Sequence, residues 1–98
     1  MATDFERRER ALVLLKNHHE FPGTFEFRAV IRPEARSAVV GAVLSALSTP
    51  EPLRGLSERA SRQGTYVSVR IAVTVASAEE VLEIYEVLKA VDGVLTTM

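Results

Sequence analysis

Residues 66–75 alternate between β-branched apolar residues and other side chains, and this pattern constrains the fold more than any other feature of the chain. The apolar positions are Val67, Val69, Ile71, Val73 and Val75. A period of two is typical of a strand with one buried face, and β-branched residues favour strands. The opposite face would carry the intervening residues Tyr66, Ser68, Arg70, Ala72 and Thr74. We therefore predict a central strand in a sheet with one covered and one open face.

Weaker patterns predict three more strands. At 25–32 the residues Phe25, Phe27, Ala29 and Ile31 alternate with Glu26, Arg28, Val30 and Arg32. The two phenylalanines fall on the same face as the valines of the central strand, so we predict that they pack in the core and do not stack on nucleic-acid bases. A short strand at about 53–61 enters a hairpin in which Gly64 has a positive φ. A last strand is predicted from Val91 to about Thr97, with Asp92-Gly93 as its turn.

Three segments are predicted to be helical. Thr3 stands at capping-box spacing before Glu6, which predicts a helix from about Asp4 to Lys16. Phe5, Leu12 and Leu15 of this helix should dock on the body of the domain or on a neighbouring subunit. Pro33 suits the first turn of a second helix, which ends near Ser48-Thr49-Pro50. Ser77 and Glu80 repeat the capping-box spacing before a third helix with apolar positions at Val81, Ile84, Tyr85 and Leu88.

The order of these elements predicts the fold class. After the first helix it is β, α, β, β, α, β, the split βαβ pattern in which both helices cover one face of a four-stranded antiparallel sheet. We predict an α+β, ferredoxin-like two-layer sandwich over residues 21–98, with residues 1–20 as an N-terminal helical extension. A chain of 98 residues with 47% hydrophobic residues can form one core without disulfides or metals.

Composition and charge limit the function classes. The net charge of −1 argues against a general nucleic-acid binder, but residues 28–70 net +4 and residues 79–92 net −4. The chain has no cysteine, which is compatible with a reducing cytosol. The first ten residues lack the apolar core of a secretory signal, and no apolar run approaches the roughly 20 residues of a membrane span. We predict a soluble, cytoplasmic protein without membrane contact.

The open face is the predicted functional surface. It should carry Glu26, Arg28 and Val30 of the first strand beside the polar side of the central strand. We predict that Arg28, Tyr66, Ser68 and Arg70 bind a small anionic ligand or a protein partner. His18-His19 has no spaced third ligand, so we predict a solvated loop there, with no metal and no cofactor.

Several short motifs resemble the YbeD family of small, uncharacterised bacterial proteins. They are Phe21-Pro22, Phe25-x-Phe27, Ser61-x-x-Gly64-x-Tyr66-x-Ser68-Val69 and Tyr85-x-x-Leu88, with Gly64 to Val69 the most specific part. The resemblance implies a ferredoxin-like fold similar to ACT domains, regulatory modules that commonly bind amino acids at subunit interfaces. The turn at Asp92-Gly93-Val94 also looks ACT-like, whereas the loop at residues 32–35 lacks the glycine that ACT loops usually place after the proline.

Three classes of function follow. A non-catalytic regulatory or adaptor domain, acting through self-association as a homodimer, a protein partner or a small ligand, agrees best with the open face and the resemblance. An acylphosphatase-like hydrolase would need a glycine-rich phosphate cradle after the first strand, where this chain has Arg32-Pro33-Glu34. RNA binding would need two or three exposed aromatic side chains on the open face, and only Tyr66 is predicted there.

Overall fold

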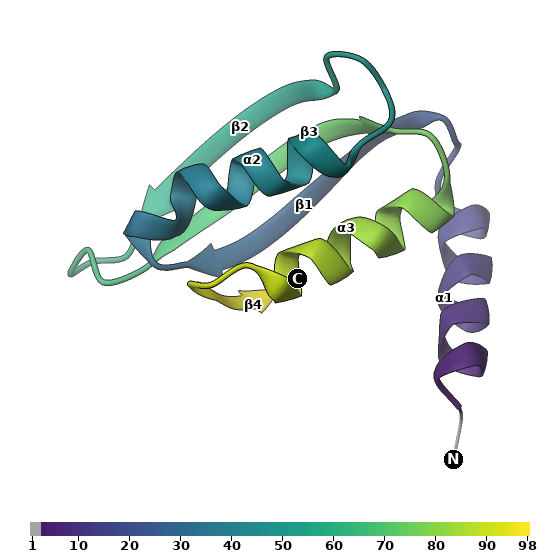
Figure 1. Cartoon of the computed structure of the whole chain (residues 1–98), viewed down its shortest axis with the longest axis horizontal. Coiled ribbons are helices and arrows are strands. Elements are labelled where there is room, and N and C mark those ends of the chain that lie inside the picture. The colour runs from purple at the N-terminus through teal and green to yellow at the C-terminus, as the bar shows by residue number, and fades with distance from the viewer. Residues whose placement is uncertain (1–2) are drawn as a thin grey trace.

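The computed structural model describes residues 3–98 as a four-stranded antiparallel sheet with two helices on one face and a further helix at one end (Figure 1). Residues 1–2 of the predicted extension lie outside the described residues. The predicted α+β, ferredoxin-like architecture is confirmed. In chain order the elements are α1 (Asp4–His18), β1 (Gly23–Ile31), the 3-10 helix η1 (Pro33–Ala35), α2 (Arg36–Ala46), β2 (Leu53–Ala60), β3 (Val67–Val75), α3 (Ala78–Ala90) and β4 (Val94–Thr97).

The strand order of the sheet is β2-β3-β1-β4, so the predicted first and third strands lie side by side at its centre. Their antiparallel register sets Phe27 opposite Ile71 and Arg28 opposite Arg70. Directly opposed residues point to the same side of a sheet, and successive residues point to opposite sides. The apolar residues of both strands therefore share one face, and the polar residues share the other.

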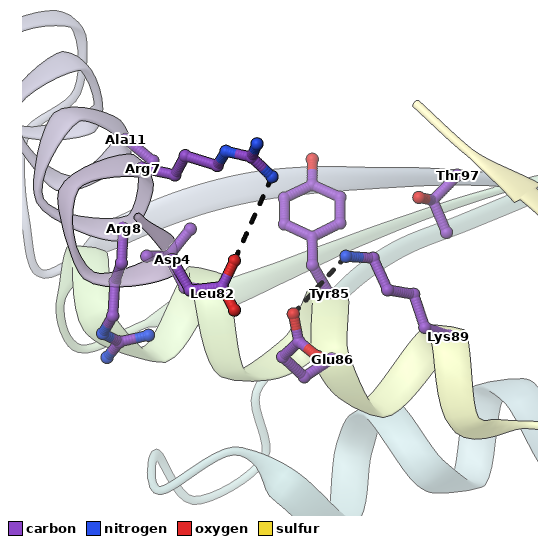
Figure 2. A pocket seen from close by; sticks show the side chains of 9 residues that line it. All are labelled: Asp4, Arg7, Arg8, Ala11, Leu82, Tyr85, Glu86, Lys89 and Thr97. Carbon is purple, nitrogen blue, oxygen red and sulfur yellow. Dashed lines mark hydrogen bonds and ion pairs between the residues drawn. The ribbon is translucent and has the colours of Figure 1, made fainter. Parts of the chain in front are cut away.

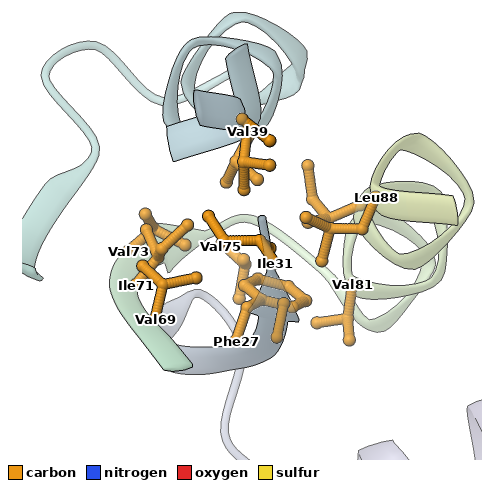
Figure 3. Close-up of a cluster of buried hydrophobic side chains, with 13 residues drawn as sticks. Phe27, Ile31, Val39, Val69, Ile71, Val73, Val75, Val81 and Leu88 are labelled. Carbon is orange, nitrogen blue, oxygen red and sulfur yellow. The ribbon is translucent and has the colours of Figure 1, made fainter. Parts of the chain in front are cut away.

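The core lies between the apolar face of the sheet and helices α2 and α3 (Figure 3). Phe27 and Ile71 from the sheet are each 1% exposed, and Val39 and Leu88 from the helices are fully buried. Phe27 is in the core as predicted. Phe25 is half-buried and contacts Phe27, with 4.8 Å between the ring centroids and the two rings tilted. Both phenylalanines thus lie on the covered face, where they cannot stack on a base bound to the open face.

Helix α3 begins where the Ser77/Glu80 spacing predicts, and Glu80 also joins two parts of the fold. The Ser77 hydroxyl accepts a hydrogen bond of 3.2 Å from the amide of Glu80. The Glu80 carboxylate accepts bonds from the amide of Ala76, at 3.1 Å, and from the hydroxyl of Ser48, at 2.7 Å. Since Ser48 follows α2, this buried carboxylate fastens the end of α2 to the start of α3.

Helix α1 docks on its own domain, against α3, through only part of its predicted apolar side. Leu12 is buried and Leu15 half-buried, whereas Phe5 is 71% exposed and does not dock on the body of its own domain, so its docking on a neighbouring subunit stays a prediction. The N-terminal end of α1 points away from the sandwich (Figure 1). Between residues 3 and 98, none of the helices has both the length and the apolar composition that a membrane crossing requires.

The last strand is shorter than predicted, because it begins at Val94 and not at Val91. Helix α3 continues to Ala90, Val91 caps it, and Gly93 turns the chain with a φ of 93°. A Cβ atom on Gly93 would lie 2.6 Å from the Cβ of Ala35 in η1. The turn therefore leaves no room for a side chain at residue 93.

Candidate functional site

The candidate site is the open face of the sheet, defined as the side of β1, β2 and β3 that faces away from α2 and α3. The register places the predicted residues together: Arg28 lies opposite Arg70, and Ser68 lies two residues before Arg70 on β3. Tyr66 immediately precedes β3 and is 47% exposed. The four predicted site residues therefore share one surface.

Arginines dominate this face. Arg28 forms an ion pair of 2.9 Å with Glu26 on the same strand, and Arg54 donates a hydrogen bond of 2.9 Å to the Thr74 hydroxyl. Arg59 joins the face because it pairs with Ser68 across β2 and β3. Like charges that oppose each other directly on a sheet are unfavourable, so the Arg28–Arg70 pair does not contribute to the stability of the fold.

The hairpin between β2 and β3 is held by Ser61. Its hydroxyl accepts a 3.0 Å hydrogen bond from the Tyr66 amide, and its backbone amide donates to the Tyr66 carbonyl at 2.8 Å. Gly64 has a φ of 73°, as predicted, and its amide donates to the Ser61 carbonyl at 2.9 Å. These bonds fix the positions from which Arg62 and Tyr66 extend.

Two adjoining hollows lie beside this hairpin, and we call them together the hairpin hollow. One is lined by Arg59, Ala60, Ser61, Arg62, Tyr66 and Ser68, and the other by Ser57, Glu58, Arg59, Ser68 and Arg70. Of the predicted site residues, Tyr66, Ser68 and Arg70 line the hairpin hollow, whereas Arg28 lies next to it, opposite Arg70.

Sequence reasoning missed Arg59 and Arg62 as site residues. Their positions depend on how β2 pairs with β3, and β2 is the strand with the weakest alternation. A usable signal was present, because a hairpin closed between Ser61 and Tyr66 pairs residue 59 with residue 68 and so places Arg59 on the open face.

The loop after β1 does not provide a phosphate cradle of backbone amides. The amide of Arg32 donates to the Gly93 carbonyl and that of Ala35 to the Arg32 carbonyl, at 2.8 and 2.9 Å. The amide of Arg36 donates to the Pro33 carbonyl, and proline has no amide proton. Only the amide of Glu34 remains, and one donor cannot surround an anion as an acylphosphatase loop would.

A second hollow lies between α1 and α3 (Figure 2). Four of its charged groups pair with one another, Arg7 with Asp4 at 4.0 Å and Lys89 with Glu86 at 3.4 Å, while Arg8 forms no ion pair within residues 3–98. Tyr85 lies between these pairs and donates a 3.2 Å hydrogen bond to the Met98 carbonyl. Burial of the ring raises the pKa of Tyr85 above its usual value, so its hydroxyl stays protonated and holds the C-terminal residue.

The loop predicted at His18-His19 is wrong for His18, which is the last residue of α1, although both histidines are exposed as predicted. His19 follows it and packs on Phe25, with 5.1 Å between ring centroids. The His19 ring is exposed and lies tilted against that of the half-buried Phe25, at the junction of α1 and β1.

The fold and the open face define the class of this protein, a ferredoxin-like α+β domain with an uncovered, arginine-bearing sheet. A family model described as "Protein of unknown function (DUF493)" matches residues 16–98. The chain therefore belongs to the DUF493 family, and the resemblance to the YbeD family is confirmed. The α1 side of the hollow in Figure 2, which consists of Asp4, Arg7, Arg8 and Ala11, lies outside the matched residues.

Curated relatives support this assignment. The chain is 36% identical over 76 residues to a UPF0250 protein of Shewanella piezotolerans and 32% identical over 77 residues to one of Shewanella halifaxensis. Each match covers 76% of this chain and 84% of the relative.

Two solved structures share the fold at low sequence identity. Protein HP0495 from H. pylori superimposes with a TM-score of 0.68 at 17% identity, covering 82% of this chain and 85% of that one. The C-terminal domain of the MgtC protein from Mycobacterium tuberculosis gives 0.67 at 15% identity, with 83% and 88% covered. At these identities the likeness concerns the fold alone.

Proposed function

We propose that this chain is a non-catalytic regulatory or adaptor domain that works by binding a partner or ligand on its open sheet face. The observation that carries the proposal is the row of arginines on an uncovered sheet, two of which, Arg28 and Arg70, oppose each other without benefit to the fold. Residues kept at a cost to stability are often functional. The resemblance to ACT-like regulatory modules and the lack of an amide cradle after β1 support the same proposal.

The test compares two double variants with the same change in charge. Arg28→Glu/Arg70→Glu reverses the open face, and Lys16→Glu/Lys89→Glu reverses two exposed cations on the helix side. Each full-length protein is purified from the organism that encodes it, and the bound molecules are identified by mass spectrometry. We expect a molecule that co-purifies with the wild type and with the helix-side variant but not with the open-face variant. A molecule that both variants retain, or both lose, would contradict it.

The proposal includes a homodimer in the cytoplasm. Both outer strands of the sheet, β2 and β4, have one side without a neighbouring strand, and proteins commonly protect such edges. Exposed leucines lie on both of these strands, Leu53 and Leu56 on β2 and Leu95 on β4. Light scattering over a range of concentrations tests the dimer, because a mass that stays near 10.8 kDa up to about 100 µM would contradict it.

A further inference from the structure

The arginines of the hairpin hollow differ from the other arginines of the open face. Arg28 is paired with Glu26, and Arg54 is bonded to Thr74. Within residues 3–98, Arg59, Arg62 and Arg70 form neither an ion pair nor a side-chain hydrogen bond. The one carboxylate that lines the hollow, Glu58, is paired with Arg36. Arg59 and Arg62 thus line one part of the hollow, and Arg59 and Arg70 line the other, without an ion-pair partner among the described residues.

Building on the proposed function, we propose that the hairpin hollow binds the phosphate group of a small molecule. A guanidinium group donates two parallel hydrogen bonds to a carboxylate or a phosphate. A carboxylate has two oxygens and one charge, which a single arginine can satisfy. A terminal phosphate has three free oxygens and close to two charges, so it can engage two or three guanidinium groups together. Each part of the hairpin hollow offers two arginines, Arg59 with Arg62 in one and Arg59 with Arg70 in the other, which suits a phosphate better than a single carboxylate.

The remaining lining residues suit the same ligand. Ser57, Ser61 and Ser68 add hydroxyl groups, which donate to phosphate oxygens readily. The two parts of the hollow have volumes of 570 and 420 Å³, comparable with small-molecule sites of about 300–1,000 Å³. Tyr66 stands at the edge with a half-exposed ring, on which a planar group attached to the phosphate can stack.

The same chemistry favours a small phosphorylated molecule over RNA. A single-stranded RNA site combines a basic groove with several aromatic side chains, one for each stacked base. The open face has Tyr66 alone, because Phe25 and Phe27 lie on the covered side. The unpaired arginines all come from the β2–β3 hairpin and reach from its turn to the middle of β3, whereas Arg28 on β1 is already paired with Glu26, so they do not form a track across the whole face.

The test uses the full-length, ¹⁵N-labelled protein and follows its amide resonances by NMR during titration. The probes are inorganic phosphate, pyrophosphate, AMP, glutamate as a carboxylate without phosphate, and a short oligouridine. We expect phosphate, pyrophosphate and AMP to shift the resonances of Ser61, Tyr66 and Ser68 in a saturable manner, with glutamate at least tenfold weaker. Equal binding of glutamate, or the absence of saturable shifts with every phosphate probe, would overturn the proposal.

Variants separate a defined site from diffuse attraction to a basic face. Arg59→Gln/Arg62→Gln should weaken pyrophosphate binding about tenfold or more, since charge-assisted hydrogen bonds are lost. Arg32→Gln/Arg54→Gln removes the same charge outside the hollow and should change binding less than threefold. Equal losses in both variants would show diffuse attraction and overturn the proposal. The dispersion of the amide spectrum reports whether each variant is folded.

The titrations with AMP and with oligouridine identify the kind of molecule that carries the phosphate. Tyr66→Leu should weaken the binding of AMP but leave the binding of inorganic phosphate unchanged. This result is expected only if the Tyr66 ring stacks on the planar group of the ligand. Oligouridine that binds far more tightly than AMP, with shifts across the whole sheet, would overturn the small-molecule assignment. In that case, or if no phosphate probe binds, the co-purification test can still succeed, so failure of this inference is distinguishable from failure of the proposed function.

Discussion

The covered and open faces of the sheet are formed by alternate residues of the same strands, yet different forces determine them. On the covered face, Phe27, Ile71 and Val73 are buried against α2 and α3, and their volumes are constrained by close packing. On the open face, Arg28 and Arg70 oppose each other in water. Close packing therefore constrains which residues can occupy the covered face. It does not constrain the residues of the open face, which are available for binding.

The largest contrast is expected between two neighbours on β3. Ile71→Ala should lower the free energy of unfolding by about 2–5 kcal/mol, because it removes buried methyl groups and leaves a cavity. Arg70→Ala should change it by less than about 0.5 kcal/mol, since the side chain is exposed and forms no pair. Urea denaturation of both variants measures the difference. Similar losses would mean that the open face is also part of the packed structure.

Two glycines with positive φ allow a second comparison. Gly93→Ala should cost about 2–4 kcal/mol, because it adds the strain of a left-handed conformation to an overlap with Ala35. Gly64→Ala has the same kind of backbone strain, but nothing lies within 4 Å of the added atom, so a cost of about 1 kcal/mol is expected. Thermal unfolding of the two variants side by side is the measurement, and a larger effect at Gly64 would contradict the packing argument.

A third comparison concerns two glutamates on α3. Glu80→Ala should destabilise the domain by about 1–3 kcal/mol, because it leaves the Ala76 amide and the Ser48 hydroxyl without their acceptor. Glu83→Ala, on the exposed side of the same helix, serves as the matched control and should have almost no effect. Chemical denaturation at neutral pH distinguishes the two, and equal effects would show that the link between α2 and α3 contributes nothing.

These comparisons also indicate which parts of the structure were accessible from sequence. The alternation at residues 66–75, the turn at Gly64 and the start of α3 follow from local rules, and the structure confirms them. The bond from Glu80 to Ser48 joins residues that are 32 positions apart, and no local pattern encodes it. The exposure of Phe5 likewise depends on where α1 meets α3, which helical periodicity alone does not determine.

The candidate site was predicted in part for the same reason. Tyr66, Ser68 and Arg70 lie on the strand with the clearest period, so their common face could be deduced. Arg59 and Arg62 depend on the register of β2, which contains an irregularity between Leu53 and Gly55. Irregular pairing of this kind disturbs a period of two, and the strand then gives little information about its own faces.

The smallest expected effect has the opposite sign. Arg70→Glu should raise the free energy of unfolding by about 0.2–1 kcal/mol, because an opposite charge then faces Arg28 across the central strands. The same change should abolish saturable binding of pyrophosphate in the hairpin hollow. Denaturation at low and high salt checks the first effect, which salt should weaken. A less stable Arg70→Glu variant would contradict the view that this arginine is kept for binding.

The hairpin hollow has one property with evolutionary meaning. All of its lining residues come from residues 57–70, a single continuous segment, whereas the central strand pair joins residues 23–31 to residues 67–75. A gene can therefore acquire, retune or lose this site through a few substitutions in one hairpin, without compensating changes in the core. If the hollow binds phosphate as proposed, the chemistry that selects the ligand is encoded in this one hairpin, apart from the residues that form the core.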